Sequence, residues 1–289
     1  MPTSREKARS LIIVVIVYVF ALALGLVAAV AVPTANLLIA ALVADLVATV
    51  VVFAASRIAG NSSLYDPYWS VVPPFIAAFW IVGLSLGQPG SYGPTAQVAL
   101  LVASVPLLIW AVRLTANWVR RWRGTSDEDW RYEMLKGMLG RFDWLIDFLG
   151  IHLFPTMQVF LGMVPFYFLA DRLLVGGPAT PAAWGAMIAG AVIMLAAVGL
   201  ESVADRQLAR FRREGGTGLL KTGIWGIMRR PNYLGEILFW WGLWVASVAG
   251  AVPVWTVIGP LAMTALFVFI SIPMMDRHLE RRHAAPANE

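Results

Sequence analysis

Apolar runs of membrane-spanning length recur along this chain and limit the folds that it can adopt. A helix that crosses a bilayer needs about 20 mostly apolar residues. Eight segments come near this length, namely Leu11–Ala31, Leu37–Ala55, Val71–Leu86, Ala96–Val112, Leu149–Ala170, Ala183–Leu200, Ile237–Ala249 and Pro253–Ile272. Because 59% of the 289 residues are hydrophobic and only 13% are charged, a soluble core could not absorb this apolar surface. We therefore expect an all-α, polytopic transmembrane helical bundle of about eight spans.

The distribution of the basic residues indicates how these spans are oriented in the membrane. If eight helices cross the membrane, all 22 Lys and Arg residues except Arg172 fall on one side. Basic loops of membrane proteins face the cytoplasm, so both termini are expected there, in a bacterial cytoplasmic membrane. This distribution also accounts for the net charge of +5 without a nucleic-acid partner. The first apolar run is about twice as long as the apolar part of a signal peptide, so we expect it to be retained.

The predicted organisation is one integral membrane domain over residues 1–289. Its parts are the N-terminal helices (11–62), the substrate-side helices with a basic loop (63–148), the C-terminal half with the cofactor motif (149–282) and a polar tail (283–289). The chain has no cysteine, and its three histidines are far apart, so no metal site is expected.

Polar side chains gather at four predicted helix ends on the basic side. They are Asp66 before the third span, Arg113 and Asn117 at the end of the fourth, Glu201 and Asp205 at the end of the sixth, and Glu236 at the start of the seventh. Ionisable groups at membrane depth are rare and usually functional. Such a set suits a cytosolic cofactor that carries phosphates and an amide-bearing ring. Any single arginine can equally serve only to orient the spans, and the tryptophans nearby, including Trp240, are typical of an interfacial aromatic belt.

The segment Arg229–Glu236 is harder to explain by topology alone. Pro231 is expected to start a helix, Gly235 allows close approach of another backbone, and Asn232 and Glu236 share a helical face. A glycine-rich nucleotide fingerprint is missing, because Gly215–Gly218 lacks the required strand–turn–helix context. A nucleotide would then be held by side chains of helices and loops, with arginines on its phosphates.

These residues resemble a known family. The run Gly223–Glu236, with its Arg-x-Pro-Asn-Tyr-x-Gly-Glu core, is similar to the C-terminal half of the steroid 5α-reductase family, and more loosely to sterol reductases and isoprenylcysteine methyltransferases. Upstream, the segments Tyr65–Ser70, Arg113–Trp118 and Asp205-x-Gln207 resemble a bacterial branch of the same superfamily labelled a domain of unknown function. The resemblance extends from about Ser63 to Arg277 and implies a seven-helix reductase core with one added N-terminal helix.

The resemblance implies NADPH-dependent reduction of the C=C bond of a lipid α,β-unsaturated ketone. The hydride goes to the β-carbon while an Asp/Tyr pair holds the carbonyl oxygen. Asp66 stands where the family has Glu, and Trp110 stands where it has the partner tyrosine, so Tyr65 or Tyr68 is expected to supply the phenol. The implied substrate-binding residues are Trp69, Trp110 and Arg113. The substrate would be a lipid-soluble, steroid-like molecule that enters a monomeric protein from the bilayer.

The resemblance also implies a set of NADPH-binding residues. They are Asn117, Arg121, Arg123, Glu201, Asp205, Arg212, Arg229, Arg230, Asn232, Tyr233 and Glu236. Two other functions share parts of the pattern. One is an S-adenosylmethionine-dependent methyltransferase of the isoprenylcysteine type. The other is a non-catalytic lipid carrier or transporter, for which the expected internal repeat is missing.

Overall fold

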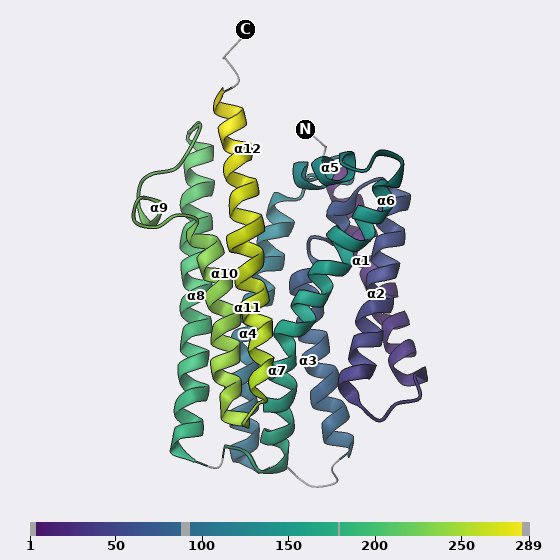
Figure 1. The fold of residues 1–289 in the computed structure, drawn as a ribbon, viewed down its shortest axis with the longest axis vertical. Helices are drawn as coiled ribbons and strands as arrows, with labels where there is room; N and C mark the ends of the chain where they lie inside the picture. The colour runs from purple at the N-terminus through teal and green to yellow at the C-terminus, as the bar shows by residue number, and fades with distance from the viewer. Residues whose placement is uncertain (1–3, 88–92, 179, 285–289) are drawn as a thin grey trace.

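The computed structural model describes residues 4–87, 93–178 and 180–284, and over these residues it is a bundle of helices without strands (Figure 1). The long helices are α1 (Ser4–Ala31), α2 (Leu37–Ala59), α3 (Tyr68–Gly87), α4 (Pro94–Arg121), α7 (Phe154–Gly176), α8 (Pro181–Arg213), α10 (Pro231–Ser247) and α12 (Ile272–Ala284). Shorter segments join them, namely η1 (Ser62–Tyr65), α5 (Trp130–Gly137), η2 (Gly140–Phe142), α6 (Asp143–Ile146), η3 (Asp147–Leu153), α9 (Ile224–Ile227), η4 (Val248–Gly250), η5 (Val254–Val257), α11 (Ile258–Ala265) and η6 (Leu266–Ser271).

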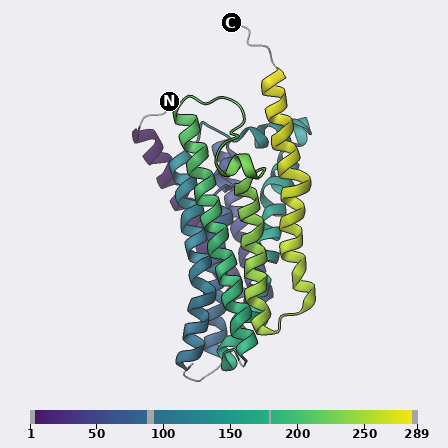
Figure 2. The same ribbon diagram turned by 90° about the vertical axis from the view of Figure 1, so that its left-hand side faces the viewer.

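Seven helical segments of the described chain are long and apolar enough to cross a membrane. The protein is therefore an integral membrane protein, and the prediction of an all-helical, polytopic bundle is confirmed. The remaining predicted span corresponds to α10, which has 17 residues and runs alongside α8 (Figures 1 and 2). This helix begins at Pro231, as predicted, and ends before the turn at Gly250 and Pro253. That turn forms the expected hairpin between α10 and α11.

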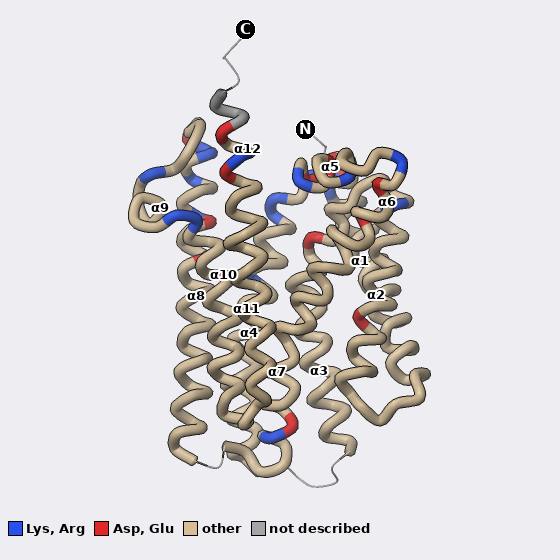
Figure 3. The backbone as a smooth tube through the Cα atoms, in the orientation of Figure 1, with Lys and Arg blue, Asp and Glu red and all other residues tan. Residues whose placement is uncertain are grey.

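Both chain ends lie at the same end of the bundle (Figure 1). Lys, Arg, Asp and Glu residues are concentrated there, whereas the rest of the bundle is nearly free of them (Figure 3). We call this the charged end. Arg172 lies near the C-terminal end of α7, at the opposite end. The predicted separation of basic residues thus appears in the fold.

Three glycines bring α8 and α10 into backbone contact. A Cβ atom added at Gly190 would lie 2.2 Å from the Ala246 nitrogen, and one added at Gly235 would lie 2.4 Å from Glu201 Cγ. At Gly242 the corresponding distance, to Met194 Cγ, is 2.9 Å. In lipid, helices associate where small residues let their backbones approach. The close approach predicted at Gly235 is confirmed, and it holds the start of α10 against the charged end of α8.

This contact gives a first prediction. Gly190→Ala should lower the free energy of unfolding by about 1–3 kcal/mol, because the added methyl forces α8 and α10 apart. Gly199→Ala is the matched control, since Gly199 lies on the same helix and its Cβ would meet no atom within 4 Å. Unfolding of both variants in detergent would be compared. Equal destabilisation by the two substitutions would contradict the packing described here.

Candidate active site

Polar side chains of α4 and α8 meet at the charged end in what we call the ion cluster, formed by Arg113, Asn117, Glu201 and Asp205. Arg113 pairs with Glu201 and, at 3.1 Å, with Asp205. The Asn117 amide donates to Asp205 Oδ2 at 2.6 Å. The two residues from each helix are four apart and therefore share one face. The cluster is largely enclosed, because the Arg113 side chain is 15% exposed and that of Glu201 only 3%.

Glu236 of α10 lies beside the ion cluster and is held by two indoles. Its Oε2 accepts from Trp110 Nε1 and its Oε1 from Trp240 Nε1, both at 3.2 Å. Trp110 also stacks on Phe239, with ring centroids 4.4 Å apart. Both tryptophans are fully buried, so the assignment of Trp240 to a lipid-facing belt is wrong. These donors fix the orientation of the Glu236 carboxyl group.

Three polar atoms around this cluster are buried and have no hydrogen-bond partner in the described part of the chain. They are Arg113 Nε, Glu201 Oε1 and Asn232 Oδ1. Asn232 precedes Glu236 by one turn on α10, and the intervening Gly235 lies directly against Glu201. Leaving a buried polar group unpaired costs about 1–3 kcal/mol, so native proteins usually satisfy it. One donor and two acceptors from three helices thus remain available to a polar ligand.

The turn before α10 forms one rim of the site. Arg229 and Arg230 both bind Asp276 of α12, at 2.5 and 3.0 Å. Arg230 adopts the left-handed backbone conformation, with φ of 55°, which is unfavourable for a residue with a side chain and is often found at functional sites. The Tyr233 ring lies 5.2 Å from that of Phe267. The predicted binding motif therefore contacts α12 through its two arginines and η6 through Tyr233.

Three more predicted cofactor residues lie at the charged end with exposed side chains. Arg121 is the last residue of α4, and Arg123 lies two residues further along the chain. Arg212 lies in the last turn of α8. Arg123 Nε is 3.9 Å from Asp127 Oδ2. The three guanidinium groups carry positive charge beside the helices that form the ion cluster.

Asp66 lies between η1 and α3 and accepts a hydrogen bond from a phenol that the sequence did not point to. Tyr132 Oη of α5 donates to Asp66 Oδ1 at 2.6 Å, and the Arg131 guanidinium carbon lies 5.7 Å from the centre of the Tyr132 ring. Burial raises the pKa of Tyr132 well above its usual range, and the charge of Asp66 raises it further. The phenol therefore stays protonated and can act as a hydrogen-bond donor.

The expectation that Tyr65 or Tyr68 is the phenol beside Asp66 is corrected by this contact. Tyr65 Oη lies 2.7 Å from Thr156 Oγ1, and Tyr68 Oη donates to Asp45 Oδ1 at 2.7 Å. Both tyrosines therefore point into a separate network inside the bundle. Tyr132 follows Asp66 by 66 residues, and no local sequence pattern connects the two.

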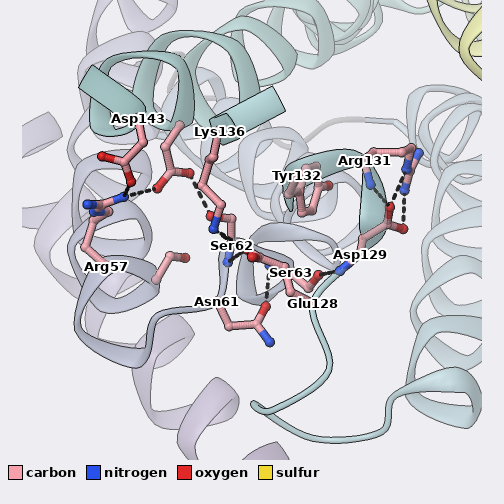
Figure 4. Close-up of polar contacts among 12 residues, drawn as sticks. Arg57, Asn61, Ser62, Ser63, Glu128, Asp129, Arg131, Tyr132, Lys136 and Asp143 are labelled. Atoms are coloured by element: carbon pink, nitrogen blue, oxygen red, sulfur yellow. Dashed lines mark hydrogen bonds and ion pairs between the residues drawn. The ribbon is translucent and has the colours of Figure 1, made fainter. Parts of the chain in front are cut away.

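Residues 61–63, which precede α3, bind the segment that carries Tyr132 (Figure 4). Asn61 Nδ2 donates to the Thr125 carbonyl at 2.8 Å, and the Asp129 amide donates to Ser63 Oγ at 2.8 Å. Glu128 Oε1 accepts from the Ser62 amide at 2.6 Å. Burial opposes ionisation of Asp129, but the adjoining Arg131 more than offsets it and holds the pKa of Asp129 below its usual value. The loop is therefore fixed to the residues that precede α3.

Two contacts connect the Asp66 side of the molecule with the ion-cluster side. Ser70 and Thr115 are hydrogen-bonded at 2.8 Å and join α3 to α4. The rings of Trp130 and His278 stack 3.7 Å apart and join α5 to α12. Trp69, predicted to bind substrate, is partly buried against the core on α3.

The sequence-predicted residues thus separate into groups. The structure brings together Trp110, Arg113, Asn117, Glu201, Asp205, Asn232 and Glu236. Arg229 and Arg230 form a rim that contacts α12, Tyr233 contacts η6, and Asp66 lies with Tyr132. Three participants were missed: Tyr132, Trp240 and Asp276. Of these three, only the contact of Trp240 could have been predicted from the sequence, because Trp240 follows Glu236 by four residues on the same helix.

Comparison with known proteins places these features in a family. The family model described as "Protein of unknown function (DUF1295)" matches residues 52–288. An uncharacterized protein of Schizosaccharomyces pombe is 26% identical over an alignment of 234 positions, which covers 72% of this chain and 64% of that protein. The chain therefore spans less than two thirds of the length of this relative. No solved structure matched the chain significantly.

Proposed function

The chain belongs to the DUF1295 family, and we propose that this member is an NADPH-dependent reductase of a lipid α,β-unsaturated ketone, like the steroid 5α-reductases that it resembles. One observation carries the proposal. The helices that bear the matching motifs converge on a cluster with three buried polar atoms, Arg113 Nε, Glu201 Oε1 and Asn232 Oδ1, which have no partner among the described residues. Native proteins leave few buried polar atoms unpaired, so these three atoms support the binding of a polar ligand here.

The residues present fit a pyridine dinucleotide. The oxygens of Asn232 and Glu201 can accept from an amide or from sugar hydroxyls, and the guanidinium of Arg113 can donate. Glu236, fixed by Trp110 and Trp240, offers a further oriented carboxyl group. The exposed guanidinium groups of Arg121, Arg123 and Arg212 suit phosphates, because they stay charged at any physiological pH. In this proposal the charged end faces the cytosol, where the dinucleotide is found.

Asp66 and Tyr132 are the residues that we assign to the ketone. When bound, NADPH supplies the hydride that adds to the β-carbon. As electron density moves to the carbonyl oxygen, the neutral Tyr132 phenol turns the single hydrogen that it donates to Asp66 toward that oxygen, and a proton from water completes the reduction at the α-carbon. Asp66 holds that phenol at 2.6 Å, and Arg131 lies over its ring. Donors that are fixed in advance in an enclosed site stabilise such developing charge effectively.

Nucleotide binding tests the proposal directly. NADP⁺ should raise the unfolding temperature of the purified protein, and Glu236→Ala should weaken NADP⁺ binding by about 10- to 100-fold, the range for loss of a charged hydrogen bond. Asp171→Asn, at the opposite end of the bundle, is the control and should bind NADP⁺ normally. Stabilisation by S-adenosylmethionine but not by NADP⁺ would contradict the reductase and favour the methyltransferase.

A further inference from the structure

The last helix joins the two sides of the proposed active site. At the charged end, α12 lies between the turn that precedes α10 and helix α5 (Figure 1). Among the described elements, α12 packs extensively only against η6, from which it continues. Its contacts at the charged end are therefore made by individual side chains, chiefly those of Asp276 and His278.

Asp276 holds the turn that begins the nucleotide motif. Its carboxylate binds one arginine with each oxygen, Arg229 at Oδ2 and Arg230 at Oδ1. The Arg230 side chain is 12% exposed and that of Asp276 20%, so solvent screens this pair less than a surface pair. The left-handed backbone of Arg230 is unfavourable and persists only where its surroundings hold it. Asp276 therefore fixes the start of α10, two residues before Asn232.

His278 holds the helix that carries the proposed ketone donor. Its imidazole ring stacks on the Trp130 indole, with centroids 3.7 Å apart and planes inclined by 18°. Trp130 is the first residue of α5 and precedes Tyr132 by two residues. Tyr132 in turn donates to Asp66. The stack therefore links α12 to the segment that places the phenol.

These two contacts use opposite faces of α12. An α-helix has 3.6 residues per turn, so side chains two positions apart point about 200° apart around its axis. Asp276 and His278 are both partly buried, whereas Arg277 between them is exposed. A helix that covered only one side of the site would carry its contacts on one face. The arrangement is that of a spacer between the nucleotide motif and α5.

The proposed reaction depends on the separation of these two elements. Hydride transfer needs reacting atoms about 3–3.5 Å apart, and a displacement of about 1 Å can cost about 100-fold in rate. In the proposed function, α4, α8 and α10 hold the nucleotide, while Asp66 and Tyr132 hold the ketone. The hydrogen bond between Ser70 and Thr115 joins the two sides at one place. A single link leaves them free to rotate about it, and α12 supplies a second.

We propose that Asp276 and His278 are positioning residues, which hold the nucleotide motif and the Tyr132 phenol at a fixed separation. Neither side chain is assigned a contact with substrate or nucleotide in this role. Asp276 acts through Arg229 and Arg230, and His278 acts through Trp130. The role in hydride transfer rests on the proposed reductase function, whereas the mechanical link between α5 and α10 does not.

A distance measurement on the intact protein in lipid tests this link. Because the chain has no cysteine, spin labels can be placed selectively with Met138→Cys, just after α5, and Ile227→Cys on α9. The replaced side chains are 68% and 81% exposed, and α9 is bound to α8 through Trp225 and the Ala204 carbonyl. Pulsed electron paramagnetic resonance should give one narrow distance distribution. Adding His278→Ala should broaden it.

Matched variants separate positioning from general loss of structure. His278→Phe retains a ring that can stack on Trp130 and should keep the narrow distribution. Asp276→Ala should broaden it, whereas Glu280→Ala, which removes an exposed carboxylate one turn further along α12, should not. In an enone reduction assay, His278→Ala should lower kcat by about 10- to 100-fold and leave the dissociation constant for NADP⁺ unchanged, and His278→Phe should restore kcat.

The proposal is overturned if His278→Ala leaves the distance distribution narrow, or if His278→Phe broadens it equally. An unchanged kcat in His278→Ala, in a protein that reduces the enone, would also overturn the positioning role. If the unmodified protein reduced no enone, the reductase would be rejected together with that role. The label distances would still decide whether α12 links the two sides.

Discussion

Asp66→Leu should reduce the turnover of an enone by about 10²–10⁴-fold, the contribution of a positioned proton-donating group, and leave NADPH affinity nearly unchanged. The leucine cannot hold the Tyr132 phenol, which Asp66 binds at 2.6 Å. The proposed nucleotide site is formed by α4, α8 and α10, which this substitution does not touch. Tyr132→Phe should lower turnover in the same way, because it removes only the phenol oxygen. The kcat, KM and dissociation constant for NADPH of each variant would be measured.

Tyr167→Phe is the matched control for this prediction. Tyr167 lies in the C-terminal half of α7 among aromatic side chains, away from Asp66, so loss of its oxygen should leave kcat unchanged. Normal turnover by Asp66→Leu would show that the carbonyl is bound elsewhere. Full activity of Tyr132→Phe alongside an inactive Asp66→Leu would return the phenol role to another tyrosine.

Arg113→Met should lower the free energy of unfolding by about 3 kcal/mol, the lower end of the range for breaking a buried ion pair. The substitution leaves Glu201 and Asp205 without their cation. Adding Glu201→Gln should recover part of the loss, because it removes one of the uncompensated charges. Equilibrium unfolding in mixed micelles measures both effects.

Arg172→Met provides the comparison for this stability effect. Arg172 is exposed at the end of the bundle opposite the ion cluster, so its removal should have little effect on unfolding. A loss at Arg113 no larger than that at Arg172 would mean that the pairs with Glu201 and Asp205 contribute nothing to stability. A double variant as unstable as Arg113→Met alone would mean that Glu201 is not the unpaired charge.

Local sequence patterns predicted a large part of this fold, because backbone polar groups inside a bilayer must be hydrogen-bonded within the span itself. Each span must be an apolar helix, so span positions and the charge separation follow from single runs of residues. The features at the start of α10 likewise depend only on neighbouring residues, namely Pro231, Gly235 and the spacing of Asn232 and Glu236. Their helix start, close contact and shared face could therefore be anticipated.

Contacts between distant segments were beyond this kind of prediction. Tyr132 reaches Asp66 only because the loop before α5 is fixed to Asn61 and Ser63, and the paths of polar loops follow no periodic pattern. Asp45 likewise had no visible partner in the sequence. Its bond to Tyr68 depends on how α2 and α3 are rotated against each other, which side-chain packing decides.

NADPH oxidation by the detergent-purified protein, followed with and without a 3-oxo-Δ4 steroid such as testosterone or progesterone, tests the proposed reduction most directly. The product mass would be recorded in the same experiment. Steroid-dependent oxidation and a product heavier by two hydrogens are expected, both lost in Asp66→Leu. An absence of turnover, together with stabilisation by S-adenosylmethionine and none by NADP⁺, would contradict the reductase.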